Sequence, residues 1–146
     1  MNEVIDFTVA RLKTEEGFKQ YPYNDATGAR VSCLPNGNLT WLYGLNLETE
    51  GSLELGELCL RWKLGKLLTS LSSYSWFATC NSARQSALLD IAYNEGVHGL
   101  LNFPSMIHYI SIKDWPNAQK ECSVGDPRLK ARYDKLGNIL LTGVNE

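Results

Sequence analysis

The sequence predicts an α+β fold, in which a small antiparallel β-sheet lobe lies beside a larger helical lobe with a cleft between them. Residues 21–47 combine tight-turn signals (N-D-A-T-G and P-N-G-N) with short β-prone runs (V-S-C-L and L-T-W-L-Y). Apolar residues recur at helical spacing before and after that region. With 146 residues, 44% of them apolar and 21% charged, the chain is expected to form a single domain over residues 1–146.

The N-terminal segment is predicted to be a helix. Ile5, Val9 and Leu12 follow helical spacing within residues 2–15. Gly17 comes directly after this pattern, where a glycine commonly ends a helix. Glu16 is therefore expected in the last turn, just before the chain enters the sheet lobe.

The sheet lobe is expected over about residues 18–50, with two or three short strands that must lean on helices because so small a sheet is marginal alone. The leucine-rich residues 53–71 predict a linking helix, and residues 72–146 make the helical lobe together with the N-terminal helix. Asn81 or Ser82 is the N-cap candidate for the apolar run A-L-L-D-I-A-Y-N. Further helices are expected over residues 104–112, 114–122 and 126–141.

Composition excludes several classes of partner. The net charge is −2 and no Lys/Arg block stands out, so we expect no nucleic-acid partner. No apolar stretch is long enough to span a bilayer, and the N-terminus M-N-E-V-I-D-F carries acids where a signal peptide carries bases. We expect a monomer that is made in the cytoplasm, with no metal and no cofactor.

The four cysteines, Cys33, Cys59, Cys80 and Cys122, are scattered, without a C-x-x-C pair or metal-ligand spacing. This pattern favours free thiols in a reducing compartment, and two disulfide bonds are the alternative.

Two carboxylates and a hydroxyl stand near the amino end of the chain. Asp25 follows Glu16 by nine positions, and Thr40 opens the run T-W-L-Y-G. A glycoside hydrolase needs one carboxyl group to protonate the leaving oxygen and a second carboxylate to act on water or on the developing positive charge. A pair at such spacing is also common on ordinary charged surfaces, so the pair alone is weak support.

Longer stretches carry a family resemblance. The run E-G-F-K-Q-Y-P-Y-N-D-x-x-G, followed by T-x-x-Y-G, resembles the catalytic signature of the phage-type lysozymes, the muramidases of T-even phages and their relatives in glycoside hydrolase family 24. A-R-Q-S-A-L-L-D-I-A-Y-N-E-G-V-H-G-L-L-N-F resembles the core helix of that family and the turn after it. D-W-P-N-A-Q and D-P-R-L-K-A-R-Y with L-L-T-G resemble its later helices, so the likeness runs in order over nearly the whole chain.

The resemblance implies a lysozyme-like fold and hydrolysis of the β-1,4 bond between N-acetylmuramic acid and N-acetylglucosamine in bacterial peptidoglycan, with inversion at the anomeric carbon. Glu16 would be the general acid, Asp25 the second carboxylate that positions or deprotonates water, and Thr40 the residue that holds this water. The mechanism requires Glu16 to be protonated while Asp25 is ionised.

The resemblance also implies supporting residues. Arg132 would pair with the catalytic glutamate, although it could instead be a surface arginine; Tyr93 and Asn94 would line the sugar cleft, although Tyr93 could instead be core packing. Three departures from the family pattern stand near the site: the segment between the second carboxylate and the threonine is longer, Leu42 replaces a glycine, and Leu45 replaces a histidine.

Other functions stay open at this point. The chain could be a wall-binding or virion structural module with a lysozyme fold and no activity, or a lytic transglycosylase, which needs one acid and no water-directing aspartate. Bacterial peptidoglycan is the expected partner. Lysis from inside a host cell would require a separate pore-forming protein to give access to the wall, and the alternative is a particle-borne enzyme that opens the wall during entry.

Overall fold

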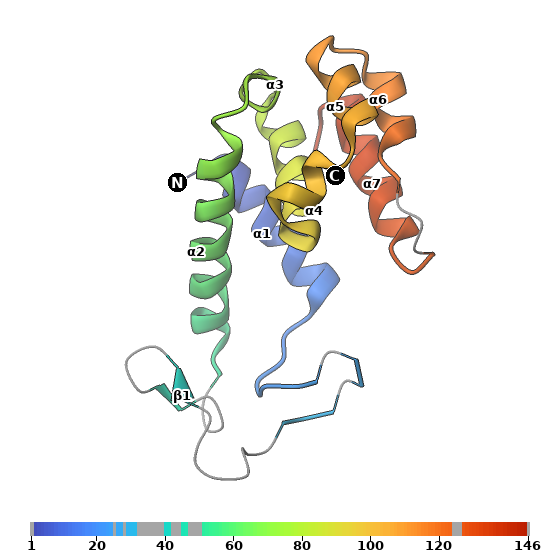
Figure 1. Cartoon of the computed structure of the whole chain (residues 1–146). Helices are drawn as coiled ribbons and strands as arrows, with labels where there is room; N and C mark the ends of the chain where they lie inside the picture. The colour runs from blue at the N-terminus through green and yellow to red at the C-terminus, as the bar shows by residue number, and fades with distance from the viewer. Residues whose placement is uncertain are drawn as a thin grey trace.

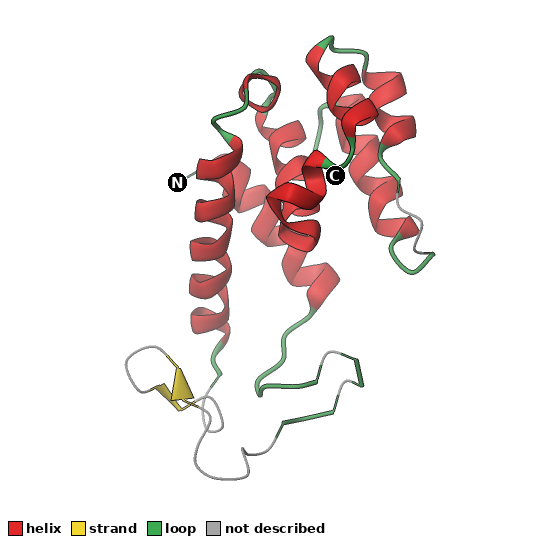
Figure 2. Cartoon of the chain, in the orientation of Figure 1, coloured by secondary structure: helices red, strands yellow, loops and turns green. Residues whose placement is uncertain are grey.

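The computed structural model describes residues 2–24, 26–27, 29–31, 40–41, 45–46, 51–123 and 127–145. These residues form an all-α fold with seven helices, shown in Figures 1 and 2. The helices are α1 (Glu3–Glu16), α2 (Leu53–Leu71), α3 (Ser75–Ala78), α4 (Ser82–Leu101), α5 (Pro104–Ser111), α6 (Trp115–Glu121) and α7 (Lys130–Thr142).

The predicted α+β class is therefore wrong. In the described part of the chain, extended structure is limited to β1 (Thr40–Trp41) paired antiparallel with β2 (Leu45–Asn46), and to one isolated bridge between Tyr23 and Arg30. Strands of two residues each provide too few cross-strand side-chain pairs to stabilise a sheet with a buried face. Most of the predicted run V-S-C-L lies outside the described residues.

The turn signals of this region act locally instead of joining long strands. The side-chain oxygen of Asn24 accepts hydrogen bonds from the backbone N–H groups of Ala26 (2.9 Å) and Thr27 (3.3 Å). Such an Asx turn satisfies the backbone without a partner strand. Figure 2 shows the described residues that directly follow α1 as loop.

Helix α4 is the centre of the core. Its residues Ala87, Leu88, Leu89 and Ile91 are fully buried, and the helix contacts α1, α2 and α7. Figure 1 shows α4 between α2 and α7. A helix that is apolar around most of its circumference has to be covered on several sides, so the apolar run predicts this central place.

Three long helices begin at side-chain caps. Asn2, Ser52 and Asn81 each accept a hydrogen bond from a backbone N–H in the first turn of α1, α2 and α4, respectively. Helix α2 covers the same residues, 53–71, that the leucine pattern predicts. Within the described residues, no helix combines the length and the apolar character needed to cross a bilayer.

The thiols of Cys59, Cys80 and Cys122 are free, as the spacing predicts, and Cys33 lies outside the described residues. Burial raises the pKa of the Cys80 thiol to about 11, although the charges of Arg84 and Lys113 oppose this shift. Burial also raises the pKa of Cys122 to about 12. Cys59 is half-buried.

These environments predict an order of thiol reactivity. In native protein at pH 8, we expect iodoacetamide to alkylate Cys59 at least about tenfold faster than Cys80 or Cys122, because the thiolate is the reactive form and the two buried thiols stay protonated. Below pH 11 the alkylation of Cys80 should rise with pH, as its thiolate fraction grows. Peptide mapping by mass spectrometry measures each cysteine separately. Equal rates for Cys59 and Cys80 at pH 8 would contradict the burial described here.

Candidate functional site

A buried carboxylate joins three helices. Asp90 in α4 is fully buried, and its two oxygens accept hydrogen bonds from arginines of α1 and α7. Arg11 Nε lies 2.6 Å from Asp90 Oδ2, while Arg132 Nη2 and Nε lie 2.8 Å and 3.1 Å from Oδ1. A buried charge has to be paired and hydrogen-bonded, and here two guanidinium groups perform both tasks.

Arg132 extends this network to the surface. Its Nη1 donates to Glu16 Oε1 over 2.9 Å, so one guanidinium group bridges the buried carboxylate of Asp90 and the carboxylate of Glu16. The side chain of Arg132 is 10% exposed and that of Glu16 is 43% exposed. Burial lowers the pKa of Arg132, but the charge of Asp90 and the hydrogen bonds to both carboxylates outweigh burial and raise its pKa. Arg132 therefore stays charged and holds the Glu16 carboxylate from the buried side.

Arg11 fixes the opposite end of the network. Its Nη2 donates to the backbone oxygen of Ser86 in α4 over 2.8 Å, and its Nη1 donates to Asn145 Oδ1 over 3.0 Å. The C-terminal segment thus contacts the same arginine that pairs with Asp90. With its guanidinium donors directed to three residues, Arg11 has little freedom to leave the buried carboxylate.

Glu16 is placed by the end of α1. Gly17 follows it with φ +66°, a conformation that residues with a Cβ rarely adopt, and the helix ends there. The carboxylate consequently projects from a rigid helix at the point where the chain turns away. This is a favourable origin for a side chain that must be held in one position.

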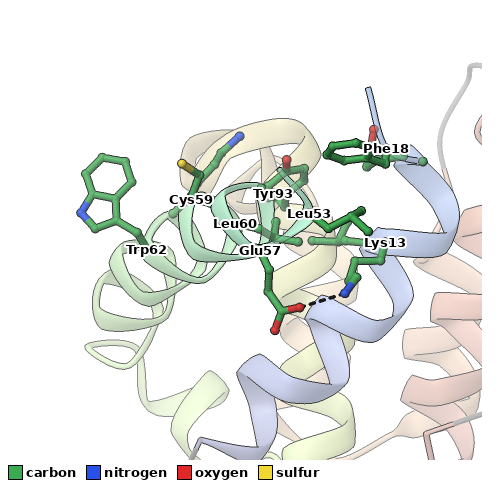
Figure 3. A pocket seen from close by; sticks show the side chains of 13 residues that line it. Lys13, Phe18, Leu53, Glu57, Cys59, Leu60, Trp62 and Tyr93 are labelled. Atoms are coloured by element: carbon green, nitrogen blue, oxygen red, sulfur yellow. Dashed lines mark hydrogen bonds and ion pairs between the residues drawn. The ribbon is translucent and has the colours of Figure 1, made fainter. Parts of the chain in front are cut away.

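Glu16 lines a cavity of about 510 Å³ between α1, α2 and the Tyr93 side chain of α4 (Figure 3). Lys13 of α1 and Glu57 of α2 form an ion pair of 2.8 Å on its wall. A second cavity, of about 370 Å³, adjoins the first and shares the lining residues Phe18, Gly56 and Cys59 with it. An elongated ligand could therefore extend from the first cavity toward the segment after α1.

Aromatic side chains contribute to both cavities. Tyr93 and Trp62 line the first one, and Phe18, which is 47% exposed, lines both. In Figure 3, Phe18 and Trp62 lie at opposite sides of the view with Tyr93 between them. Burial, followed by the negative charge of Glu16, raises the pKa of Tyr93, so this hydroxyl keeps its proton as a hydrogen-bond donor.

The structure brings some of the predicted site residues together. Glu16 and Arg132 are in contact, and Tyr93 lines the cavity with Glu16. Asn94 instead faces the guanidinium group: with its amide oxygen directed to Arg132, it accepts from Nε (3.2 Å) and Nη2 (3.1 Å). Asp25 lies outside the described residues, and for Thr40 only the backbone, at the start of β1, is described.

The sequence prediction missed Asp90, Arg11 and Lys63. A signal for Asp90 was present, because this aspartate interrupts the apolar run A-L-L-D-I-A-Y-N of a helix that had to be buried. A buried carboxylate requires a cationic partner, but this rule does not single out Arg11 and Arg132 among the arginines of the other helices. Lys63, on an exposed position of α2, gave no such signal.

No family model matches the chain, and a search of the curated proteins finds no significant relative. In the part of the chain that the structure describes, no group of three histidine, cysteine or acidic side chains is arranged to hold a metal ion. In the described residues, a group that could donate or accept a proton at this cavity is Glu16. It is held by the guanidinium group of Arg132 and lines a cavity with aromatic side chains.

The Asp90 network makes a prediction about stability. Asp90→Asn should lower the free energy of unfolding by about 3–5 kcal/mol, because Arg11 loses its carboxylate partner and Arg132 keeps only the partly exposed Glu16. Asp134→Asn is the matched control, since its carboxylate pairs with Lys130 at 2.6 Å on the exposed surface of α7. The control should change the free energy of unfolding by less than about 1 kcal/mol. Urea unfolding followed by circular dichroism measures both, and equal small losses would contradict the buried role of Asp90.

Proposed function

We propose that the chain is a peptidoglycan muramidase, which hydrolyses the β-1,4 bond between N-acetylmuramic acid and N-acetylglucosamine with Glu16 as general acid. One observation carries the proposal: Glu16 lies at the cavity with its Oε1 held 2.9 Å from Arg132 Nη1. A general acid must be fixed within hydrogen-bond reach of the bond that breaks. The described fold is all-α and does not match the predicted α+β fold, so it gives the proposal no support. The proposal rests on this site and on the motif resemblance to the phage-type lysozymes.

The cavity suits a saccharide. Its volume of about 510 Å³ lies within the range of roughly 300–1,000 Å³ that is usual for small-molecule sites. Sugar rings present apolar C–H faces and polar edges, and the cavity offers aromatic rings together with the polar groups of Tyr93, Lys13 and Glu57. The adjoining second cavity leaves room for a polymer to continue past the site of cleavage.

Arg132 suits the charge change at Glu16. When a general acid gives its proton to the glycosidic oxygen, it becomes a carboxylate. A permanent cation 2.9 Å away stabilises that carboxylate as it forms, and it needs no rearrangement because Asp90 already fixes it. The proton that Asp25 would take from the attacking water balances the one that Glu16 gives up, and exchange through solvent would reset both carboxyl groups before the next turnover.

The remaining parts of the mechanism follow the family resemblance. Asp25 would direct or deprotonate the attacking water and Thr40 would hold it, which gives inversion at the anomeric carbon. The target lies in the bacterial cell wall, so lysis from inside a host cell would require a separate pore-forming protein. No metal enters this scheme.

Removal of the acid tests the proposal. Glu16→Gln should lower the rate of clearing of a cell-wall suspension by about 10²- to 10⁴-fold, because the amide cannot donate a proton to the leaving oxygen. Glu15→Gln is the matched control: Glu15 is the preceding residue of α1 and pairs with Lys135 at 2.9 Å, and this variant should stay within about twofold of the parent.

Two results would contradict the proposal. One is a parent protein that clears the suspension no faster than Glu16→Gln. The other is a product mixture with anhydromuramic ends, which mass spectrometry distinguishes from the reducing ends that hydrolysis leaves.

A further inference from the structure

Lys63 differs from the other charged residues of the cavity. Among the described residues that line it, Lys13 pairs with Glu57 at 2.8 Å and Glu16 pairs with Arg132 at 2.9 Å. Glu57 is also bound by Arg61, at 2.9 Å. Among the described residues, Lys63 forms no ion pair with a carboxylate, so its positive charge has no counter-ion in that part of the chain.

The contact that Lys63 does make orients its charge without neutralising it. Its Nζ lies 3.9 Å from the centroid of the Tyr93 ring. A cation–π contact holds an ammonium group against the ring face, while its N–H donors stay available to a further acceptor. Lys63 is exposed and lines the cavity, whereas Tyr93 is half-buried.

Tyr93 connects this ammonium group to the candidate acid. Tyr93 and Glu16 both line the first cavity, and the negative charge of Glu16 is one of the causes that raise the pKa of the Tyr93 hydroxyl. Lys63, Tyr93 and Glu16 thus line the same cavity, and Lys63 is in contact with Tyr93. If the glycosidic bond of a saccharide lies at Glu16, substituents on the neighbouring sugar rings would come near the ammonium group of Lys63.

We propose that Lys63, supported by the Tyr93 ring, is a subsite for a carboxylate carried on the muramic acid branch of the glycan. This inference rests on the proposed function. N-acetylmuramic acid differs from N-acetylglucosamine by a lactyl group with a carboxylate, and in peptide-bearing wall the carboxylates lie on the attached peptide instead. The net charge of the chain is −2, so attraction of an anionic polymer has to come from a local cation such as this one.

Binding separates this subsite from the chemistry. In a Glu16→Gln background, which prevents turnover, calorimetric titration should compare three ligands of equal glycan length: a peptide-free muramic acid oligosaccharide, its peptide-bearing form and an N-acetylglucosamine oligosaccharide. Lys63→Gln should weaken binding of a carboxylated ligand by about threefold to tenfold, the size expected of a charge-assisted contact at an open site. Binding of the N-acetylglucosamine oligosaccharide should change by less than about twofold.

Lys66→Gln is the matched control. Lys66 is exposed on the same helix, and its Nζ lies 4.8 Å from the Trp62 ring, but it does not line the cavity. This variant should leave all three affinities within about twofold of the parent, and Lys63→Arg should retain the preference for carboxylated ligands because it keeps the positive charge.

Each outcome has a distinct meaning. A selective loss with the peptide-free ligand assigns the lactyl carboxylate, and a selective loss with the peptide-bearing ligand alone assigns a peptide carboxylate. Equal losses for carboxylated and carboxyl-free ligands, or no loss, would overturn the subsite. If the selective loss is found but protein with Glu16 intact cleaves nothing, the hydrolase proposal fails while the subsite stands.

Discussion

Asp90 lies at the centre of the helical core, with an arginine from α1 on one oxygen and an arginine from α7 on the other. The side chains of Arg11 and Arg132 are only 11% and 10% exposed, respectively. Two guanidinium groups with so little access to water need a negative charge between them. The ion pairs tie the first and last helices to the central one, and they also determine where Arg132 directs its remaining donor. Stability and the geometry of the surface site thus depend on the same buried carboxylate.

The site combines a rigid back and an open front. The carboxylate of Glu16 is held by Arg132, which is anchored in the packed helices. Glu16 also lines a cavity with exposed aromatic rings. The general acid of the proposed reaction would need both properties: a fixed position relative to the reacting bond and access for substrate and water. The end of α1 at Gly17 supplies this arrangement, since the helix holds Glu16 and the chain then turns away from it.

The helices were predictable because their signals are local. The leucine pattern marks Leu53–Leu71, and the cap residue Asn81 marks the start of α4. The prediction of a sheet lobe was wrong, because β-prone runs form a sheet only if partners of sufficient length pair with them. In the described residues those pairs are two residues long, and the turn around Asn24 is satisfied by its own side chain.

The residues of the candidate site also differ in how far the sequence predicted them. Glu16, Arg132 and Tyr93 were predicted from motif resemblance, and the structure places Glu16 in contact with Arg132 and beside the same cavity as Tyr93. Asp90 meets Arg11 across 79 positions and Arg132 across 42, and Lys63 meets Tyr93 from a different helix, so no local pattern joins these residues. Only the rule that a buried charge needs a partner pointed to Asp90, and it left the partner unnamed.

The dependence of Glu16 on the buried carboxylate can be measured directly in a crystal structure of Asp90→Asn, compared with one of the parent protein. If Asp90 holds Arg132 in place, the guanidinium group should turn toward solvent in the variant, and the 2.9 Å contact between Arg132 Nη1 and Glu16 Oε1 should be lost. An Arg132–Glu16 pair that keeps its position and its distance in Asp90→Asn would show that the surface site is held by something other than the core.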